Sequence, residues 1–336
     1  MSAFAGFVTF DRPLTGQETW PEAMAGRLQP PRPTKTLCRT ETAWMAQTLS
    51  AETGENGDLV LAYDGELTNR PDLCRELGLP GDTPDREVIF AAYYRWGQTC
   101  AQQLRGAFAF AVYDPRSRRL LLARDGMGVK PLFYARRGNS LIFASTLPAL
   151  LAHPQVPPEV DRQGLYELLL LGPGRTPSLG VFRGVYSLEP GQQAAFDREG
   201  LALGFHWSLQ DAPWEGSFQQ CAERVRALVE DSVQRQLDLP GEVCGFLSGG
   251  LDSSIICTLA AARLGALNTR SVDYRDNGAF FQPGGFQPEA DGAYVALMRP
   301  TLPGEHKTVV LDTPELAEAL AEAADARGWQ QCWAMR

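Results

Sequence analysis

Short apolar runs separated by turn residues fill about the first 200 positions of the chain, a pattern typical of strands joined by short connections. We expect one strand over Phe4–Phe10 and another over Asp58–Tyr63, closed by Asp64-Gly65 as a tight turn. Apolar residues three and four apart predict a helix over Asp85–Trp96. The other elements expected in this half are a helix over Pro71–Leu77 and strands over Ala107–Tyr113, Leu120–Arg124, Leu132–Tyr134 and Leu141–Ala144. Nearly continuous apolar strands are covered on both faces, which predicts an α+β sandwich with helices outside its sheets.

The pattern changes after a break at Asp211–Gly216, where helical and strand segments begin to alternate. The elements expected there are a helix from the capping box of Ser217 and Gln220 to about Leu237, a short buried strand over Val243–Leu247, an apolar helix ending near Leu264, a strand over Thr269–Tyr274, a long loop over Arg275–Asp291 and a last helix from Thr313 to near Gly328. Helix, strand, loop, helix and strand in this order begin a parallel, doubly wound domain. We therefore expect two domains, over residues 1–208 and 209–336.

The composition excludes several classes of protein. With 31 Lys and Arg against 40 Asp and Glu, the chain has a formal charge of −9, which disfavours a general nucleic-acid binder. Its seven cysteines include no Cys-x-x-Cys pair and its three histidines lie far apart, so neither a disulfide framework nor a histidine-rich metal site is expected. No apolar run approaches the roughly 20 residues of a membrane span, and the first residues lack a signal-peptide pattern. We expect a cytoplasmic protein without nucleic-acid or membrane partners.

The segment Ser248–Ser254 carries the most specific chemistry in the sequence. Two glycines let the backbone approach an anion, and the helix that follows directs unpaired N–H groups and the positive end of its dipole toward it. The serine hydroxyls add donors, and Asp252 could hold a magnesium ion beside bound phosphates. A Walker A motif is absent, and a simple glycine turn between a strand and a helix is the alternative interpretation.

The phrase GFLSGGLDSS closely resembles the pyrophosphate loop of ATP-pyrophosphatases, which cleave ATP to AMP and pyrophosphate while adenylating a substrate. Beyond this loop, the chain resembles the family of class II glutamine amidotransferases and asparagine synthetases along nearly its full length. The phrases that carry the resemblance are, in order, LAYDGELTNRPDLCRELG, DREVIFAAYYRWG, LRGAFAFAVYD, LLARDGMGVKPLFY, IFAS, GVFRGVYSLEPGQ and GFLSGGLDSS. The resemblance implies an N-terminal-nucleophile (αββα) sandwich followed by a partial α/β doubly wound ATP-pyrophosphatase domain, cut short at its C-terminal end.

In this family a glutaminase domain releases ammonia from glutamine, and a synthetase domain converts aspartate and ATP to a β-aspartyl-adenylate, which ammonia attacks to give asparagine. The resemblance therefore implies an amide ligase that uses ATP and Mg²⁺ and acts on aspartate with glutamine or ammonia, and a homodimer is compatible with it. The implied ATP- and pyrophosphate-binding residues are Leu247, Ser248, Gly249, Gly250, Leu251, Asp252, Ser253 and Ser254, with the backbone of Val272 at the adenine.

The glutaminase half departs from the family at its reacting residues. Ser2 stands where the family has its nucleophilic cysteine, and an alcohol is a much weaker nucleophile near neutral pH than a thiolate. Asp64 replaces the asparagine that donates to the oxyanion, where a carboxylate would repel the developing charge. The resemblance assigns glutamine binding to Asp64, Gly65, Glu66 and Asp85, while the loop with the family's carboxylate-binding arginine is not recognisable. We expect impaired glutaminase activity.

Two further sets of residues are interpreted as structural. The residues that match a non-catalytic turn of the family are Arg124, Asp125, Lys130 and Pro131. The thiols expected to be buried or incidental, rather than replacement nucleophiles, are Cys38, Cys74 and Cys100.

Three interpretations of the function stay open. The first is an asparagine-synthetase-type ligase that uses free ammonia if Ser2 is inert. The second is a relative without the cysteine that forms an amide within one molecule, as β-lactam synthetase and lasso-peptide cyclases do. The third is a truncated, non-catalytic remnant, because the ending Trp329–Arg336 resembles nothing that the family has there.

Overall fold

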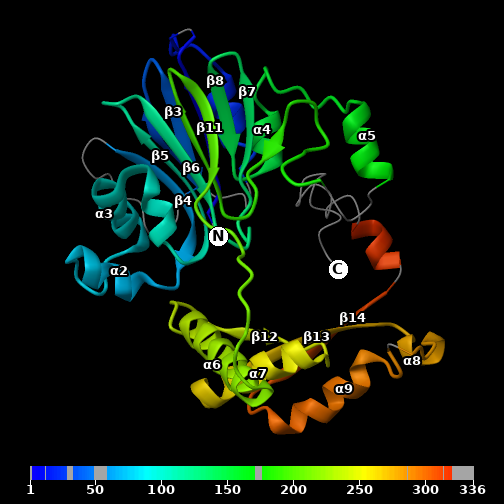
Figure 1. Cartoon of the computed structure of the whole chain (residues 1–336). Coiled ribbons are helices and arrows are strands. Elements are labelled where there is room, and N and C mark those ends of the chain that lie inside the picture. Colours follow the sequence, from blue (N-terminus) through cyan, green and yellow to red (C-terminus); the bar gives the residue numbers. More distant parts are fainter. Residues whose placement is uncertain are drawn as a thin grey trace. The chain divides into compact units, whose positions relative to one another are not determined.

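The computed structural model describes residues 2–11, 13–28, 33–48, 59–170, 176–285, 287–312 and 314–319. The described residues up to Gln210 form one compact unit, and those from Asp211 onward form a second (Figure 1). Antiparallel strands dominate the first unit, whereas the second alternates helices with parallel strands.

Two antiparallel sheets form the centre of the first unit. In spatial order, the six-stranded sheet contains β2 (Thr34–Arg39), β3 (Ala43–Thr48), β1 (Phe4–Thr9), β8 (Ser140–Ala144), β7 (Phe133–Arg137) and β9 (Tyr186–Ser187). The five-stranded sheet contains β11 (Gly200–Phe205), β10 (Gln192–Asp197), β6 (Arg119–Arg124), β5 (Gly106–Asp114) and β4 (Val60–Leu67). The strands predicted from apolar runs are confirmed at β1, β5, β6, β7 and β8.

Helices cover the outer faces of both sheets, so the first unit has four layers (Figure 1). The six-stranded sheet packs against α1 (Trp20–Ala25) and α4 (Leu147–Leu151). The five-stranded sheet packs against α2 (Arg70–Leu77) and α3 (Asp85–Trp96), both of which confirm predicted helices. The unit also contains α5 (Arg162–Leu169) and the 3₁₀-helix η1 (Gly97–Gln103).

The side chains of β1 show how the sequence builds these layers. Phe4 and Val8 pack between the two sheets, whereas Phe7 packs on the side of α1 and α4. Successive side chains of a strand point to opposite faces, so an uninterrupted apolar run suits a strand that is covered on both sides. The predicted α+β sandwich with outer helices is confirmed.

The tight turn predicted at Asp64-Gly65 is wrong, since both residues lie inside β4 and pair with β5. Asp64 lies opposite Ala109 in the register of the two strands. A Cβ atom on Gly65 would lie 2.3 Å from the carbonyl oxygen of Ala107. The glycine is therefore required by the close approach of β5 and not by a turn.

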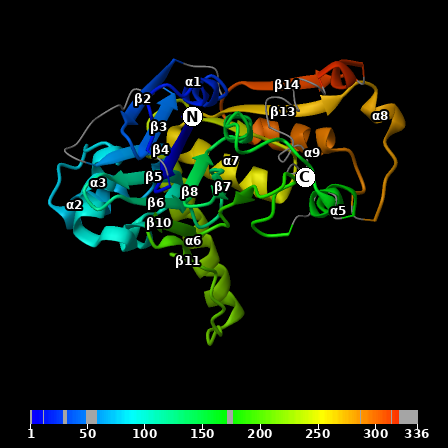
Figure 2. The same ribbon diagram turned by 90° about the horizontal axis from the view of Figure 1, so that it is seen from above.

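A parallel sheet of β12 (Cys244–Phe246), β13 (Asn268–Tyr274) and β14 (His306–Leu311) forms the centre of the second unit; β13 and β14 lie side by side in Figure 2. The other described elements are α6 (Phe218–Leu237), α7 (Leu251–Leu264), α8 (Asn277–Phe280), α9 (Asp291–Met298) and the 3₁₀-helix η2 (Arg299–Thr301). No helix in the described ranges is both long and apolar enough to cross a membrane.

The pattern of the second half predicted α6, α7, β12 and β13, and all four are confirmed. The capping box of Ser217 and Gln220 at the start of α6 is also present. The long loop predicted over Arg275–Asp291 contains α8. The last predicted helix is described only over 314–319, and its predicted end at Gly328 and the segment Trp329–Arg336 lie outside the described residues.

The two faces of the parallel sheet differ in their cover. On one face, Leu247 is buried together with Cys257 of α7 and Val295 of α9. On the other face, Phe246 is 78% exposed and Val272 is 50% exposed. The strand predicted as buried over Val243–Leu247 is buried only at Leu247. Cys244 and Phe246 are exposed because α7 and α9 pack on the opposite side of the sheet, and Val243 is 38% exposed.

A buried histidine lies beside the six-stranded sheet. His153, which follows α4, stacks on Phe7 with ring centroids 5.3 Å apart and contacts Trp20 at 4.6 Å. Its Nδ1 accepts a hydrogen bond from the backbone of Gln155, whereas its Nε2 has no hydrogen-bond partner among the described residues. Burial, helped by the charge of Arg137, lowers the pKa of His153 to about 4. The ring is therefore neutral in the folded unit at neutral pH.

We expect acid to destabilise the first unit through His153. Between pH 6.5, the ordinary pKa of histidine, and about 4, the unfolded state binds a proton that the folded state does not, so the free energy of unfolding falls as pH falls. His153→Phe keeps the stack and removes the titration. Between about pH 7 and pH 4, urea unfolding should show a loss up to roughly 3 kcal/mol larger for the unmodified chain than for the variant. Equal losses would contradict this expectation.

Candidate functional site

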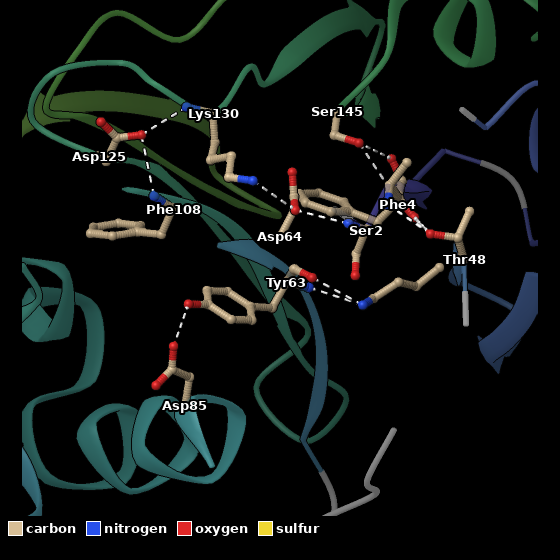
Figure 3. Close-up of polar contacts among 12 residues, drawn as sticks. Ser2, Phe4, Thr48, Tyr63, Asp64, Asp85, Phe108, Asp125, Lys130 and Ser145 are labelled. Atoms are coloured by element: carbon tan, nitrogen blue, oxygen red, sulfur yellow. Dashed lines mark hydrogen bonds and ion pairs between the residues drawn. The ribbon is translucent and has the colours of Figure 1, made fainter. Parts of the chain in front are cut away.

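A buried carboxylate joins three segments of the first unit that lie far apart in the sequence (Figure 3). Oδ1 of Asp64, in β4, accepts a hydrogen bond from the backbone nitrogen of Ser2 at 3.0 Å. The same oxygen lies 3.1 Å from Nζ of Lys130, in the loop after β6. Asp64 is 7% exposed and the Lys130 side chain 17%, so this ion pair lies largely out of water. Gly65 and Glu66 follow along β4, with Glu66 exposed.

Hydrogen bonds to neighbouring strands fix the segment around Ser2. The backbone nitrogen of Ala3 donates to Oγ1 of Thr48, at the end of β3, at 2.8 Å. The backbone nitrogen of Phe4 donates to Oγ of Ser145, which follows β8, at 2.9 Å. Figure 3 shows Ser2 lying between Asp64 on one side and these two hydroxyl residues on the other. The structure thus brings together Ser2 and Asp64, two of the residues singled out in the sequence.

Buried polar groups order the turn that carries Lys130. The carboxylate of Asp125 is fully buried and accepts hydrogen bonds from the backbone nitrogens of Met127, Val129 and Lys130. Arg124 donates to carbonyl oxygens of the same turn. The structural interpretation of this turn fits Arg124 and Asp125, but it misses the ion pair of Lys130 with Asp64. The sequence did carry a signal for this ion pair: Asp64 replaces the family's neutral asparagine, and a buried charge needs a partner.

Asp85 lies apart from Ser2, on the far side of the Tyr63 ring (Figure 3). It is the first residue of α3, and its Oδ2 accepts hydrogen bonds from the Tyr63 hydroxyl at 3.0 Å and from the backbone nitrogen of Leu67 at 2.7 Å. Burial raises the pKa of Asp85, and these two hydrogen bonds oppose the rise. The contacts of Asp85 therefore fasten α3 to β4, and none of them involves Ser2.

The thiols that could replace the family's nucleophile are poorly suited to that role. Burial raises the pKa of both Cys38 and Cys100 to about 12, which disfavours the reactive thiolate. Cys74 is 1% exposed. In the part of the chain that the structure describes, no group of three or more His, Cys, Asp or Glu side chains could hold a metal ion.

The second candidate site is the loop between β12 and α7. Oγ of Ser253 lies 2.9 Å from Oγ of Ser248 and accepts a hydrogen bond from the backbone nitrogen of Ser248 at 3.2 Å. These contacts fold the loop back onto the first turn of α7, whose first N–H groups have no acceptor within the helix. Of the other loop residues, Leu247 is buried, Ser254 is half-buried, and Leu251 and Asp252 are exposed.

The loop makes its close approach to α9 at Gly249. Its φ of +80° lies in the left-handed region, and a Cβ atom there would lie 2.7 Å from Cβ of Tyr294 and 2.8 Å from the carbonyl oxygen of Asp291. Only glycine meets both demands. Gly250 follows as the N-cap residue of α7.

A cavity of about 200 Å³ lies between the sheet and α9. Leu247, Ser248 and Val272, three residues expected to bind a nucleotide, line it. The polar lining residues that the sequence interpretation missed are Ser271, Asp273, Asp291, Arg299, His306 and Thr308. Strand alternation could have indicated Ser271 and Asp273. Both flank Val272, so their side chains point to the face of the sheet opposite its own.

Comparison with known families agrees with both units. Residues 43–207 match the glutamine amidotransferase domain family, and residues 224–329 match the asparagine synthase family. The two matches in this order define a family of ATP-dependent amidotransferases. The resemblance to the asparagine synthetase family seen in the sequence is thus confirmed by two domain matches, one in each half of the chain.

Curated proteins similar to the chain are named asparagine synthetases. The chain is 40% identical over 272 residues to "Asparagine synthetase [glutamine-hydrolyzing] 3" of Bacillus subtilis, a match that covers 78% of this chain and 44% of the relative. It is 29% identical over 206 residues to "Putative asparagine synthetase [glutamine-hydrolyzing] 2" of Methanocaldococcus jannaschii, covering 60% of this chain and 40% of the relative. The chain thus spans less than half the length of these relatives.

Solved structures of glutamine amidotransferases show a weaker likeness. Glutamine phosphoribosylpyrophosphate amidotransferase from B. subtilis is 14% identical, with a TM-score of 0.41, and the match covers 92% of this chain and 81% of that one. A glutamine aminotransferase class-II domain protein from Silicibacter pomeroyi is 10% identical, with a TM-score of 0.34, covering 60% of this chain and 97% of that one. The fold is identified instead by the layers and the two family matches, as an N-terminal-nucleophile sandwich followed by α/β structure of the ATP-pyrophosphatase type.

We expect loss of Lys130 to destabilise the first unit. Lys130→Met leaves the Asp64 carboxylate without a countercharge in a largely buried place, which typically costs about 3 kcal/mol. The double variant Asp64→Asn/Lys130→Met removes both charges and should recover most of that loss in urea unfolding.

The matched control is Arg119→Met. Arg119 lies 3.0 Å from Asp197, but its side chain is 42% exposed. Because water screens such a pair, its loss should cost less than about 1 kcal/mol. Equal destabilisation by the two single variants would mean that burial of the Asp64 pair has no energetic consequence.

Proposed function

We propose that this chain acts as an asparagine-synthetase-type amide ligase that depends on ATP and Mg²⁺. In the proposed reaction, a β-carboxylate oxygen of aspartate attacks the α-phosphorus of ATP, and pyrophosphate leaves. Ammonia then attacks the acyl carbon of the β-aspartyl-adenylate. AMP leaves and the nitrogen loses a proton, which gives asparagine.

The loop between β12 and α7 is the observation that carries this proposal. Its serine hydroxyls and the first N–H groups of α7 converge where a strand meets a helix, an arrangement suited to an anionic pyrophosphate. Val272 lines the adjoining cavity, in keeping with the adenine contact that the family resemblance assigns to its backbone. The proposed ATP site therefore uses Leu247–Ser254 together with Val272.

Asp252 is the residue that fits a magnesium ion. It is exposed in the first turn of α7, beside the proposed pyrophosphate position. Magnesium in such sites commonly binds one or two carboxylates, with substrate phosphates and water as its other ligands, so a single aspartate suffices. When bound, the ion would neutralise charge on the phosphates.

The first unit supports ammonia, rather than glutamine, as the nitrogen source. The family resemblance assigns Asp64 to the oxyanion position, and its ion pair with Lys130 fits a carboxylate there. A tetrahedral intermediate needs donors at that position, and a carboxylate only accepts hydrogen bonds. With Ser2 in place of the nucleophilic cysteine and Asp85 engaged by Tyr63 and Leu67, the glutaminase half is proposed to be impaired.

We expect ATP with Mg²⁺ to raise the melting temperature of the chain, because a ligand that binds only the folded state stabilises it. Gly249→Val should abolish the shift, since its Cβ would collide with α9. Gly278→Val is the control, because a Cβ at this exposed glycine of α8 meets nothing within 4 Å.

Aspartate-dependent release of pyrophosphate would support the ligase, whereas binding without release would favour the non-catalytic alternative. The absence of any ATP effect would contradict the proposed nucleotide site.

We expect the chain not to hydrolyse glutamine above background, and Ser2→Ala to change nothing. Ser2→Cys alone should stay inactive because Asp64 remains at the oxyanion position. Ser2→Cys combined with Asp64→Asn restores both family residues and should raise glutamate release above that of either single variant. Hydrolysis by the unmodified chain that disappears in Ser2→Ala would overturn the proposed impairment.

A further inference from the structure

The strand β11 forms one edge of the five-stranded sheet in the first unit. Among the described residues it pairs with β10 alone, in an unbroken antiparallel register from Gly200 to Phe205. Leu203 is 49% exposed and Phe205 is 56% exposed. An edge strand presents a row of unpaired N–H and C=O groups, and an exposed apolar edge is a ready template for pairing with another strand.

The other edge strands of the first unit are protected against such pairing, whereas β11 is not. β2 contains Lys35 and Arg39 and has an interrupted register, and β9 has only two residues. β4, at the opposite edge of the same sheet as β11, contains Asp64 and Glu66. Charged side chains, bulges and short length are common ways of blocking a sheet edge. The sequence of β11, GLALGF, contains no charge and no proline, and its register has no bulge.

The backbone groups on the open edge of β11 belong to its residues with large side chains. The backbone nitrogen of His206, which follows β11, donates to the carbonyl oxygen of Gly191, which precedes β10. In an antiparallel pair, residues that bond to the neighbouring strand alternate with residues that do not. His206 and every second residue before it therefore face β10. The N–H and C=O groups that point to the open edge are those of Leu201, Leu203 and Phe205.

A second copy of β11 fits this edge in the register that pairs all three outward residues. A two-fold axis through Leu203, perpendicular to the sheet, places Leu203 opposite Leu203 of the second copy and Leu201 opposite Phe205 of the second copy. The residues of each such pair can exchange both of their N–H···O bonds. Because this axis keeps each face of the sheet on the same side, the leucine and phenylalanine side chains meet on one face.

The charges near β11 do not oppose this pairing. The nearest charged side chains, Arg198 and Glu199, lie in the turn before β11. In the two-fold register they fall opposite Ser208 and Trp207 of the second copy, so no like charges meet. A strand of six residues is small beside the roughly 20–30 residues that each partner contributes to a standard interface. The association should therefore be weak and depend on protein concentration.

We propose that the open edge of β11 is a self-association surface, through which two copies of this chain join their five-stranded sheets into one continuous antiparallel sheet. Pairing supplies partners to the outward backbone groups and removes Leu203 and Phe205 from water. The proposal does not depend on the proposed function. It gives a specific interface to the homodimer with which the family resemblance is compatible.

The test places charges at the two-fold axis. Leu203→Lys puts two ammonium groups opposite each other, and Leu203→Glu puts two carboxylates there. Sedimentation of the full chain, over protein concentrations from about 1 μM to about 300 μM, should show a dimer for the unmodified chain. Each variant alone should associate about tenfold more weakly or less, because like charges repel. An equimolar mixture of the two variants should recover the dimer, since opposite charges then face each other.

Leu203→Pro is a further variant, used if the charged variants unfold. It removes an N–H that points to the open edge, where a sheet tolerates proline, and should also weaken the dimer. The control is Leu169→Lys, a change of a 77% exposed leucine on α5 that should leave association unchanged.

If the unmodified chain stays monomeric throughout the concentration range, or if the Leu203 variants associate as it does, β11 is not a self-association surface. If the charged variants are monomeric both alone and in the mixture, the two-fold pairing at Leu203 is wrong.

Discussion

A carboxylate held out of water must be surrounded by donors, and in the first unit Asp64 draws those donors from distant parts of the chain. Lys130 reaches it from the turn after β6, and the backbone of Ser2 reaches it from the segment before β1. Asp125 orders that turn, because its fully buried carboxylate accepts hydrogen bonds from backbone nitrogens of the turn. The position of one side chain in β4 thus depends on, and helps to fix, the geometry of both sheets at this end of the sandwich.

The two candidate sites differ in how their polar groups are used. In the first unit, the carboxylates of Asp64 and Asp85 accept hydrogen bonds from neighbouring groups. These two side chains therefore suit a structural role better than the stabilisation of an oxyanion, which needs donors. In the second unit, the hydroxyls of the loop and of β13 and β14 can donate or accept, and the first turn of α7 offers backbone donors. The hydrogen-bond donors that could meet an anionic ligand therefore lie in the second unit, in keeping with the proposed function.

Prediction from the sequence succeeded for elements that a single physical rule determines. Uninterrupted apolar runs indicated strands covered on both faces, and the start of α6 followed from its capping box. Prediction failed where the cause lies in a distant segment. Asp64-Gly65 has the composition of a turn, yet β5 holds it in a strand, and Phe246 is exposed because both covering helices pack on the other face. The carboxylate of Asp64 signalled that a partner was needed, but not which residue it would be. Lys130 and His306 themselves carried no local signal, since ion pairs and hydroxyl contacts across strands depend on register.

The contact of Gly249 with α9 also has a dynamic consequence. With a carbonyl oxygen of α9 only 2.8 Å from where a side chain would begin, no compressible group separates the loop from the helix. A shift of α9 toward the loop by even a few tenths of an ångström must therefore displace the loop as well. The same helix forms one wall of the cavity. A movement of that wall toward the loop is therefore passed on to the loop's donors.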